Sequence, residues 1–356
     1  MKKILTLLLA LWMLTGCVAM AAGNQLVVGS TTAMSGAFFT DLFGSNTADI
    51  DVRALLHGYN LMSWDHETGT YQINDSVVAG MAVSRDAQNN RVYTFDLYGD
   101  LKFSDGSAIT AKDYAFSILL TASPELAKLG GQSAAVGAIL GMDAYQSGKS
   151  SILRGVRLLS DTQMSITISK AYEPYFYEMA LFDYSPYPIS VLAPGCKVVD
   201  TEKGVGIVNA GGTGAAIFTA GLLQKTILDA ATGYMSHPSV VSGPYTLTRY
   251  DAQRGTASFA INPYYKGNED GEKPTIETIV YRSVANDEAI DLLLSGEVDL
   301  LNKMVAADTI SKGIQSTADQ PFSVANYPRS GLSMISFSCE RQTVSGKAVR
   351  QAIASC

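Results

Sequence analysis

The stretch LKFSDGSAITAKDYAFS, residues 101–117, carries successive local signals for secondary structure. It follows RVYTFDL, residues 91–97, whose alternating pattern is typical of a half-buried strand. Within the stretch, Asp105-Gly106 indicates a tight turn. Thr110, with an aspartate three residues later, has the pattern of a capping box. The sequence therefore predicts a strand, a turn and then a helix that begins after Thr110.

Further strand-like and helix-like segments alternate along the rest of the chain. We expect strands at residues 163–168, 245–250, 257–262 and 277–284. A helix after Asp49 or Asp51 would end at Gly58, and another would begin at Thr219. Several of the strands are close enough to form hairpins. This pattern favours a mixed α/β fold over a regular alternation of strand, helix and strand.

The amino-terminal end has the pattern of an export signal. Lys2 and Lys3 precede an apolar run, residues 4–14, that is too short to span a bilayer. The run leads to Leu-Thr-Gly-Cys17, which resembles the lipobox of bacterial lipoproteins. We therefore predict a signal peptide at residues 1–16, lipidation of Cys17 and an extracytoplasmic, membrane-anchored or periplasmic protein. Cleavage after the A-x-A pattern at residues 19–21 is the alternative.

The charge and the cysteines limit the classes of function. The chain has 26 basic and 33 acidic residues, a net charge of −7, which argues against nucleic acid as a partner. Cys196, Cys339 and Cys356 have no spacing typical of zinc sites or redox motifs. Whether Cys196 and Cys339 form a disulfide is undecided at this point, because the sequence gives no distances.

Sequence motifs for catalysis and cofactor binding are missing from the chain. It contains no G-x-S-x-G, H-E-x-x-H or phosphate-loop motif, and no dinucleotide-binding set at a strand-to-helix turn. Its 3 histidines form no clear metal-binding pattern. We therefore predict no catalytic residue, no metal site and no cofactor. A hydrolase whose site is assembled from distant residues remains an alternative.

Several segments in order resemble one family of proteins. YTFDLYGDLKFSDGSAITAKDYAFS resembles the signature of the extracellular solute-binding proteins of the peptide/nickel family, which are receptors of ABC importers. Ala108 stands where the family usually has proline. Five more segments are similar to family motifs in the same order. They are VRALLHGYNL at 52–61, SGPYTLTRY at 242–250, INPYYKGN at 261–268, LLSGEVDLL at 293–301 and VRQAIA at 349–354.

The resemblance implies a two-lobed clamshell with a subdomain inserted into lobe I. The expected parts are the tether at 17–24, the lobe I core at 25–64 and 166–275, the inserted subdomain at 65–165 and the start of lobe II at 276–356. Family members continue well beyond the last motif. We therefore expect lobe II to be incomplete and the chain to be a truncated form of a longer protein.

The resemblance also implies a function and a set of ligand contacts. The protein would not be an enzyme; it would capture oligopeptides or dipeptides and deliver them to an ABC permease and ATPase complex. Nickel, haem or another small solute is the alternative cargo. The implied ligand-binding residues are Phe43, Gly44, Ser45 and Asn46 in the loop before the first helix, and Tyr264, Tyr265 and Asn268 near the hinge.

Overall fold

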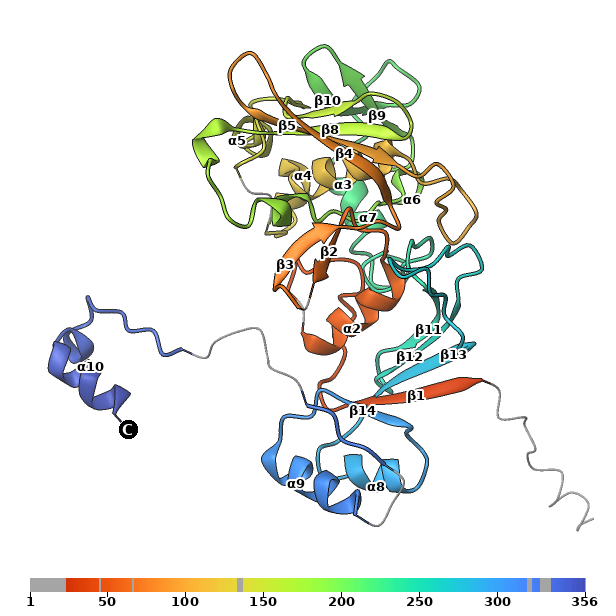
Figure 1. Ribbon diagram of the computed structural model, residues 1–356, viewed down its shortest axis with the longest axis vertical. Coiled ribbons are helices and arrows are strands. Elements are labelled where there is room, and N and C mark those ends of the chain that lie inside the picture. The colour runs from red at the N-terminus through yellow and green to blue at the C-terminus, as the bar shows by residue number, and fades with distance from the viewer. Residues whose placement is uncertain are drawn as a thin grey trace, which may run out of the picture. The chain divides into compact units, whose positions relative to one another are not determined.

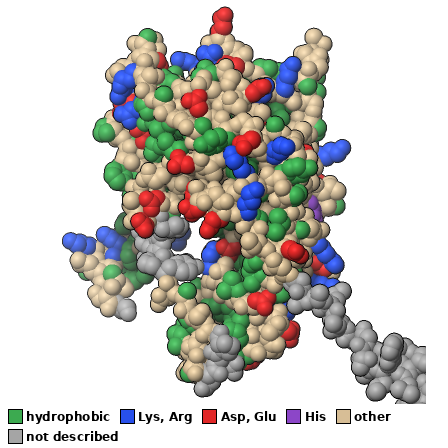
Figure 2. All heavy atoms as spheres, turned by 45° about the vertical axis from the view of Figure 1, so that its right-hand side comes forward, with side chains coloured by type: hydrophobic (Ala, Val, Ile, Leu, Met, Phe, Trp, Pro, Cys, Tyr) green, Lys and Arg blue, Asp and Glu red, His purple; other side chains and the backbone are tan. Residues whose placement is uncertain are grey.

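The structure is a computed structural model that describes residues 24–44, 46–65, 67–132, 137–318, 322–326 and 334–355. The predicted signal peptide, Cys17, Ser45 and Cys356 lie outside the described residues. The chain divides into two compact units, Met1–Thr309 and Ile310–Cys356 (Figure 1). Figure 2 shows Lys and Arg side chains interspersed with Asp and Glu on the face that it presents.

A five-stranded sheet of order β11-β12-β13-β1-β14 forms one region of the first unit. Strand β1 pairs in parallel with β13 and β14, whereas β11, β12 and β13 form antiparallel pairs. Helix α2, Thr47–Leu56, contributes Val52 and Leu56 to a buried core that also contains Phe259 and Tyr281 of the sheet (Figure 1). The strands are β1 Gln25–Ser30, β11 Tyr245–Asp251, β12 Thr256–Ile261, β13 Thr278–Ser283 and β14 Leu300–Asn302.

Helix α2 begins after Asn46, earlier than the sequence indicated. The Asn46 side-chain oxygen accepts hydrogen bonds from the N–H groups of Ala48 and Asp49, at 3.0 and 3.1 Å. The Asp49 carboxylate in turn accepts from the Asn46 N–H at 3.2 Å. The expected cap at Asp49 or Asp51 is therefore wrong, because this reciprocal pair satisfies the free N–H groups at the helix start.

Antiparallel sheets and a buried helix form the second region. A four-stranded sheet has the order β4-β5-β8-β7; a three-stranded sheet, β6-β10-β9, and a β2-β3 hairpin accompany it. In sequence order the strands are β2 Met62–Asp65, β3 Thr70–Ile73, β4 Val78–Arg85, β5 Arg91–Leu97, β6 Ile152–Leu153, β7 Val156–Leu158, β8 Gln163–Ile168, β9 Cys196–Thr201 and β10 Gly204–Asn209.

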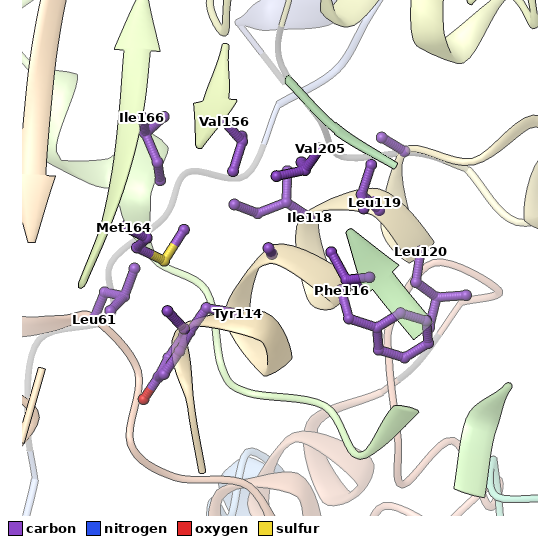
Figure 3. Packing of buried hydrophobic residues seen from close by; sticks show 14 of the residues in the cluster. Leu61, Tyr114, Phe116, Ile118, Leu119, Leu120, Val156, Met164, Ile166 and Val205 are labelled. Atoms are coloured by element: carbon purple, nitrogen blue, oxygen red, sulfur yellow. The ribbon is translucent and has the colours of Figure 1, made fainter. Parts of the chain in front are cut away.

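Helix α3, Ala111–Thr121, lies in the core of this region. Every residue from Ala111 to Leu120 except Lys112 is buried. Figure 3 shows α3 side chains together with Val156 of β7, Met164 of β8 and Val205 of β10. A helix that is buried on nearly all sides is an element covered by several neighbours.

The local signals of the opening stretch are confirmed. The Thr110 N–H donates to the Asp113 carboxylate at 2.8 Å, which is the half of a capping box that the Asp113 side chain supplies. The Thr110 hydroxyl donates to the same carboxylate at 2.9 Å. Gly106 has a φ of +84° and its N–H donates to the Phe103 carbonyl at 2.9 Å, which closes the expected turn. Glycine is favoured there because other residues rarely adopt a positive φ.

The borders drawn from the resemblance do not coincide with breaks in the structure. Residue 65 ends β2 and residue 165 lies within β8, so both limits of the expected subdomain fall inside hairpin or sheet pairs. Strands β13 and β14 follow Ile276 but share a sheet with β1. Hydrogen bonds between neighbouring strands therefore cross each border. The division into lobes stays a prediction.

The remaining helices complete the secondary structure of the described residues. They are α4 Pro124–Ala127, α5 Met142–Gln146, η1 Lys170–Tyr172, η2 Glu178–Phe182, α6 Ile189–Leu192, α7 Ala220–Thr226, α8 Ala289–Leu294, α9 Ala307–Ser316, η3 Gln342–Val344 and α10 Lys347–Ala354. Helix α7 begins after Thr219, as expected. None of the helices within the described ranges has the length and apolar character needed to cross a membrane.

Candidate functional site

A cavity of about 340 Å³ lies in the first unit, and three chain segments surround it. One is the loop that links β1 to α2, one is a face of α3, and the third runs from η2 toward α6; Ile139 adds a single lining residue from outside these three. The lining residues are Thr40, Asp41, Leu42, Ser117, Thr121, Ile139, Ala180, Leu181, Asp183, Tyr184, Ser185 and Tyr187. Cavities of this size hold small ligands or single side chains of larger ones.

Backbone hydrogen bonds position the loop wall of the cavity. The Leu42 carbonyl accepts from the Gln132 N–H at 2.7 Å, and the Asp41 carbonyl accepts from the Gly44 N–H at 2.8 Å. The Leu42 N–H donates to the Thr40 hydroxyl at 3.3 Å. Because these bonds use the backbone, the Asp41 side chain is left exposed at the cavity.

Helix α3 presents two hydroxyl groups to the cavity. Ser117 and Thr121 are four residues apart, so they lie on the same face of the helix. The Thr121 hydroxyl donates to the Ser117 carbonyl at 2.9 Å, which orients it and leaves its oxygen able to accept a hydrogen bond. The helix that fills the core of this region therefore also supplies a polar wall.

The third wall contains a carboxylate in a partly buried setting. The Asn60 amide donates to Asp183 Oδ1 at 2.7 Å, and the Ser185 hydroxyl donates to the Asn60 oxygen at 2.6 Å. Burial raises the pKa of Asp183, although the bond from Asn60 opposes this effect. Burial also raises the pKa values of Tyr184 and Tyr187 to about 12, so both phenols are neutral at physiological pH.

The expected loop residues lie next to the cavity wall, but not all of them face a ligand. Gly44 has a φ of +93° and open space where a side chain would be. Phe43 packs against the core, close to Gly131. The Asn46 side chain caps α2 and donates to the Ala33 carbonyl at 2.8 Å, so both of its ends are already bonded. Ser45 is outside the described residues.

The expected hinge residues lie elsewhere and do not line the cavity. Tyr264 is 44% exposed and covers the Gly106 turn. Tyr265 stacks on Tyr59 with ring centroids 5.1 Å apart, and burial raises its pKa to about 12. The Asn268 side chain accepts from the Glu272 N–H at 2.7 Å and so stabilises a turn. Among the described residues, no hydrogen bond or ring contact joins this group to Phe43 or Gly44.

Sequence reasoning missed the residues that supply most of the polar lining. Asp183, Tyr184 and Tyr187 belong to a segment without a regular pattern, so nothing in the sequence placed them beside the first loop. Ser117 and Thr121 carried a signal, since two hydroxyls four residues apart interrupt an otherwise apolar helix.

Cys196 and Cys339 are free thiols, so the disulfide between them that the sequence left undecided is not formed. Within the described ranges, no three His, Cys, Asp or Glu side chains are grouped to hold a metal ion.

Comparison with known proteins identifies sequence relatives over much of the chain. The profile of the bacterial extracellular solute-binding proteins, family 5 middle, matches residues 76–356. The periplasmic oligopeptide-binding protein OppA of Escherichia coli K12 is 34% identical over 111 residues, 31% of this chain and 20% of that protein. The oligopeptide-binding protein OppA of Lactococcus lactis subsp. lactis IL1403 is 27% identical over 233 residues, 64% of this chain and 32% of that protein. The chain thus spans a third or less of the length of these curated relatives.

Solved structures share the fold. Lactococcal OppA, complexed with an endogenous peptide in the closed conformation, matches with a TM-score of 0.57 and 19% identity, over 84% of this chain and 48% of that one. Listeria monocytogenes OppA bound to peptide matches with a TM-score of 0.57 and 19% identity, over 83% and 49%. The expected mixed α/β fold, of the type found in two-lobed binding proteins, is confirmed, and this chain covers about half of each solved chain.

Proposed function

This chain belongs to the bacterial extracellular solute-binding proteins of family 5, and from this premise we propose that it captures peptides outside the cell for an ABC importer. The observation that carries the proposal is the polar cavity in the first unit, within a fold that matches peptide-bound OppA structures. The cavity offers hydroxyls, carboxylates and backbone groups, which suit the alternating donors and acceptors of a peptide.

Hydrogen bonds to a peptide backbone can give affinity without selecting side chains. Each such bond contributes about 0.5–1.5 kcal/mol net. Micromolar affinity requires about 8 kcal/mol, so no single contact suffices and several walls have to act together. Phe43, Gly44 and Ser45 are proposed to contact the ligand from the loop, and Tyr264 and Tyr265 from the turn after β12. Asn46 and Asn268 would support these segments through their local bonds.

Delivery completes the proposed function. Closure of two lobes around a peptide would follow from tighter binding to the closed state. The closed form would then dock on a membrane permease that is coupled to an ATPase. A lipid on Cys17, if the lipobox is processed, would keep the receptor close to the membrane. The protein would release its cargo unchanged, which separates it from a secreted hydrolase.

Calorimetry of the purified chain with alanine peptides, from dipeptide to nonapeptide, tests this proposal. We expect only weak binding of one peptide per chain, because the chain covers about half of each solved peptide-bound chain and closure needs both lobes. Mass spectrometry should recover the peptide at its original length. Removing a hydroxyl in Thr121→Val should weaken binding about fivefold, the effect of one lost hydrogen bond. Thr248→Val, which removes a hydroxyl from β11 instead, is the matched control and should bind as the unmodified chain does. Shortened peptides, or no binding at any length, would reject the proposal.

A further inference from the structure

Three polar side chains on one face of α2 all bond to the loop that precedes this helix. Asp49, Arg53 and His57, the C-cap of α2, are spaced four residues apart, so they follow one another along the helix. Their partners are the successive loop residues 35–38, which lead into the cavity wall at residues 40–42. We call these three side chains the α2 ladder.

The first member of the α2 ladder is the carboxylate of Asp49, a completely buried residue. Its Oδ1 accepts from the N–H groups of Ser35 and Gly36, at 2.9 and 3.2 Å. Its Oδ2 accepts from the Ser35 hydroxyl at 2.6 Å and from the Asn46 N–H at 3.2 Å. One carboxylate therefore joins both ends of the loop segment, residues 35–46, that contains the cavity wall.

The other two members donate to carbonyl groups of the loop. The Arg53 guanidinium donates to the Ala37 carbonyl at 2.8 Å. His57 Nε2 lies 2.9 Å from the Phe38 carbonyl oxygen, and because a carbonyl can only accept, Nε2 carries the proton. Burial lowers the pKa of His57 to about 4, so the ring is neutral at pH 7 and this N–H is its single donor.

The α2 ladder satisfies backbone groups that have no strand beside them. Residues 36–40 are buried and belong to none of the strands in the described part of the chain. Buried N–H and C=O groups need partners, and here side chains of α2 supply them. The Phe38 N–H adds a bond to the Met235 carbonyl at 2.9 Å. The three ladder residues do not line the cavity themselves, so they act on it through the loop.

The last member of the ladder also lies behind a second wall of the cavity. The His57 ring is 6.4 Å from the ring of Tyr187, which belongs to the lining segment between η2 and α6. Phe39, the loop residue next to the cavity wall, packs edge-on against Tyr187 with centroids 4.7 Å apart. His57 therefore contacts both the loop and the segment that faces it across the cavity lining.

We propose that Asp49, Arg53 and His57 are positioning residues, which hold the loop wall of the cavity where it can meet a peptide. This inference rests on the proposed function and adds residues that have no contact with the ligand. A wall that is already fixed lowers the ordering cost of binding, because less of the loop has to be immobilised when the ligand arrives. Loss of one ladder bond should therefore weaken binding although the lining residues are unchanged.

Paired substitutions at His57 test the ladder. His57→Gln keeps a side-chain N–H for the Phe38 carbonyl, whereas His57→Leu leaves this buried acceptor without its partner. Hydrogen exchange at pH 7 without ligand would follow the amides of Phe38 and Gln132, of which the second donates to the carbonyl of Leu42 in the cavity wall. Relative to the amides of α3, both should exchange about tenfold faster in His57→Leu and within about twofold of the unmodified rate in His57→Gln.

A second pair and a control complete the exchange experiment. Arg53→Met and Arg53→Lys repeat the comparison at the Ala37 carbonyl, so the test does not depend on the folding of one variant. Tyr245→Phe removes a hydrogen bond to the Ile276 carbonyl, away from the loop, and should leave exchange at Phe38 unchanged. Equal exchange rates in His57→Leu and His57→Gln, or the same acceleration in Tyr245→Phe, would overturn the inference.

Calorimetry with trialanine in the same variants connects the loop to binding. We expect the affinity of His57→Leu to be about fivefold lower than that of His57→Gln, and Tyr245→Phe to bind as the unmodified chain does. Equal affinities of His57→Leu and His57→Gln would overturn the positioning role. Absence of binding to the unmodified chain would instead reject the proposed function, and the exchange rates would still decide whether α2 holds the loop.

Discussion

The two sheet regions of the first unit differ in how far apart their paired segments lie in the chain. In the four-stranded sheet, β4 and β5 are joined by a short hairpin, and Arg85 pairs with Arg91. In the five-stranded sheet, the first strand pairs with one of the last, and Gln25 faces Thr278. Pairing in the first region is thus largely between strands that are close in the sequence. In the second region, strands near the end of the unit pair with its first strand. Loop-closure entropy makes the second kind of pairing slower and more dependent on long-range packing.

Truncation of one buried ring in each core should produce the largest effects. Phe116 and Phe259 are both 0% exposed, in the helix core and the five-stranded sheet respectively. Phe116→Ala and Phe259→Ala should each lower the free energy of unfolding by about 3–5 kcal/mol, measured by chemical denaturation. In Phe259→Ala, amide exchange should accelerate in β1 and β13 together. Unchanged protection of β1 would contradict a shared core for these distant strands.

The two regions should also respond to pH in opposite directions. Burial lowers the pKa of His57, after α2, to about 4. The neutral histidine therefore contributes to the free energy of unfolding above pH 6.5, and this contribution is lost as the pH falls toward 4. Burial raises the pKa of Asp113, in α3, to about 6. The protonated carboxyl therefore contributes to the free energy of unfolding below pH 3.8, and this contribution is lost as the pH rises through 6. Each effect amounts to about 3 kcal/mol at most.

Two single variants should separate these opposing pH dependences of stability. Relative to the unmodified chain, Asp113→Asn should gain stability as the pH rises from 4 to 6, because the penalty for ionising a buried carboxyl is removed. His57→Gln should lose relative stability over the same range, because the unmodified chain recovers a neutral histidine. Thermal melts across this range provide the measurement. Parallel curves for both variants and the unmodified chain would show that neither group titrates differently in the folded state.

Loss of a helix cap should have a smaller effect in both regions. Asn46→Ala removes the side-chain acceptor at the start of α2 and should cost about 1 kcal/mol. Thr110→Ala at the start of α3 should cost less, since the Asp113 carboxylate still accepts from the backbone N–H of residue 110. Urea denaturation compares the two, with the exposed residue Asn286→Ala as a control. A larger loss for Thr110→Ala would reverse this ranking.

The contrast between the regions also explains what the sequence could predict. The Thr110 capping box and the Asp105-Gly106 turn depend on residues a few positions apart, and the structure confirms both. The predicted start of α2 was wrong because aspartate is a residue type favoured at helix caps. In the structure Asn46 is the cap, and the Asp49 carboxylate accepts a hydrogen bond from its N–H. The return of β13 and β14 to β1 has no local signal, so spacing could not show that strands after Ile276 share a sheet with β1.

The candidate site was less predictable than the fold for the same reason. Phe43 and Gly44, which the family resemblance implied, follow the lining segment at residues 40–42 but do not line the cavity themselves. Asp183 reaches the cavity only because the chain folds back beside α3, and the raised pKa of its carboxyl is a product of burial that no spacing reveals. Tyr264 and Tyr265, which the family resemblance implied, do not line the cavity.

The parallel pairing of β1 with β13 has a consequence for the order in which the protein can assemble. The ribosome releases β1 first, yet its neighbours in the sheet are made only after most of the chain. At ~5–20 residues per second, this strand waits on the order of ten seconds without a partner. A nascent chain therefore has a long interval in which β1 is unpaired, before the core shared by β1 and β13 can form.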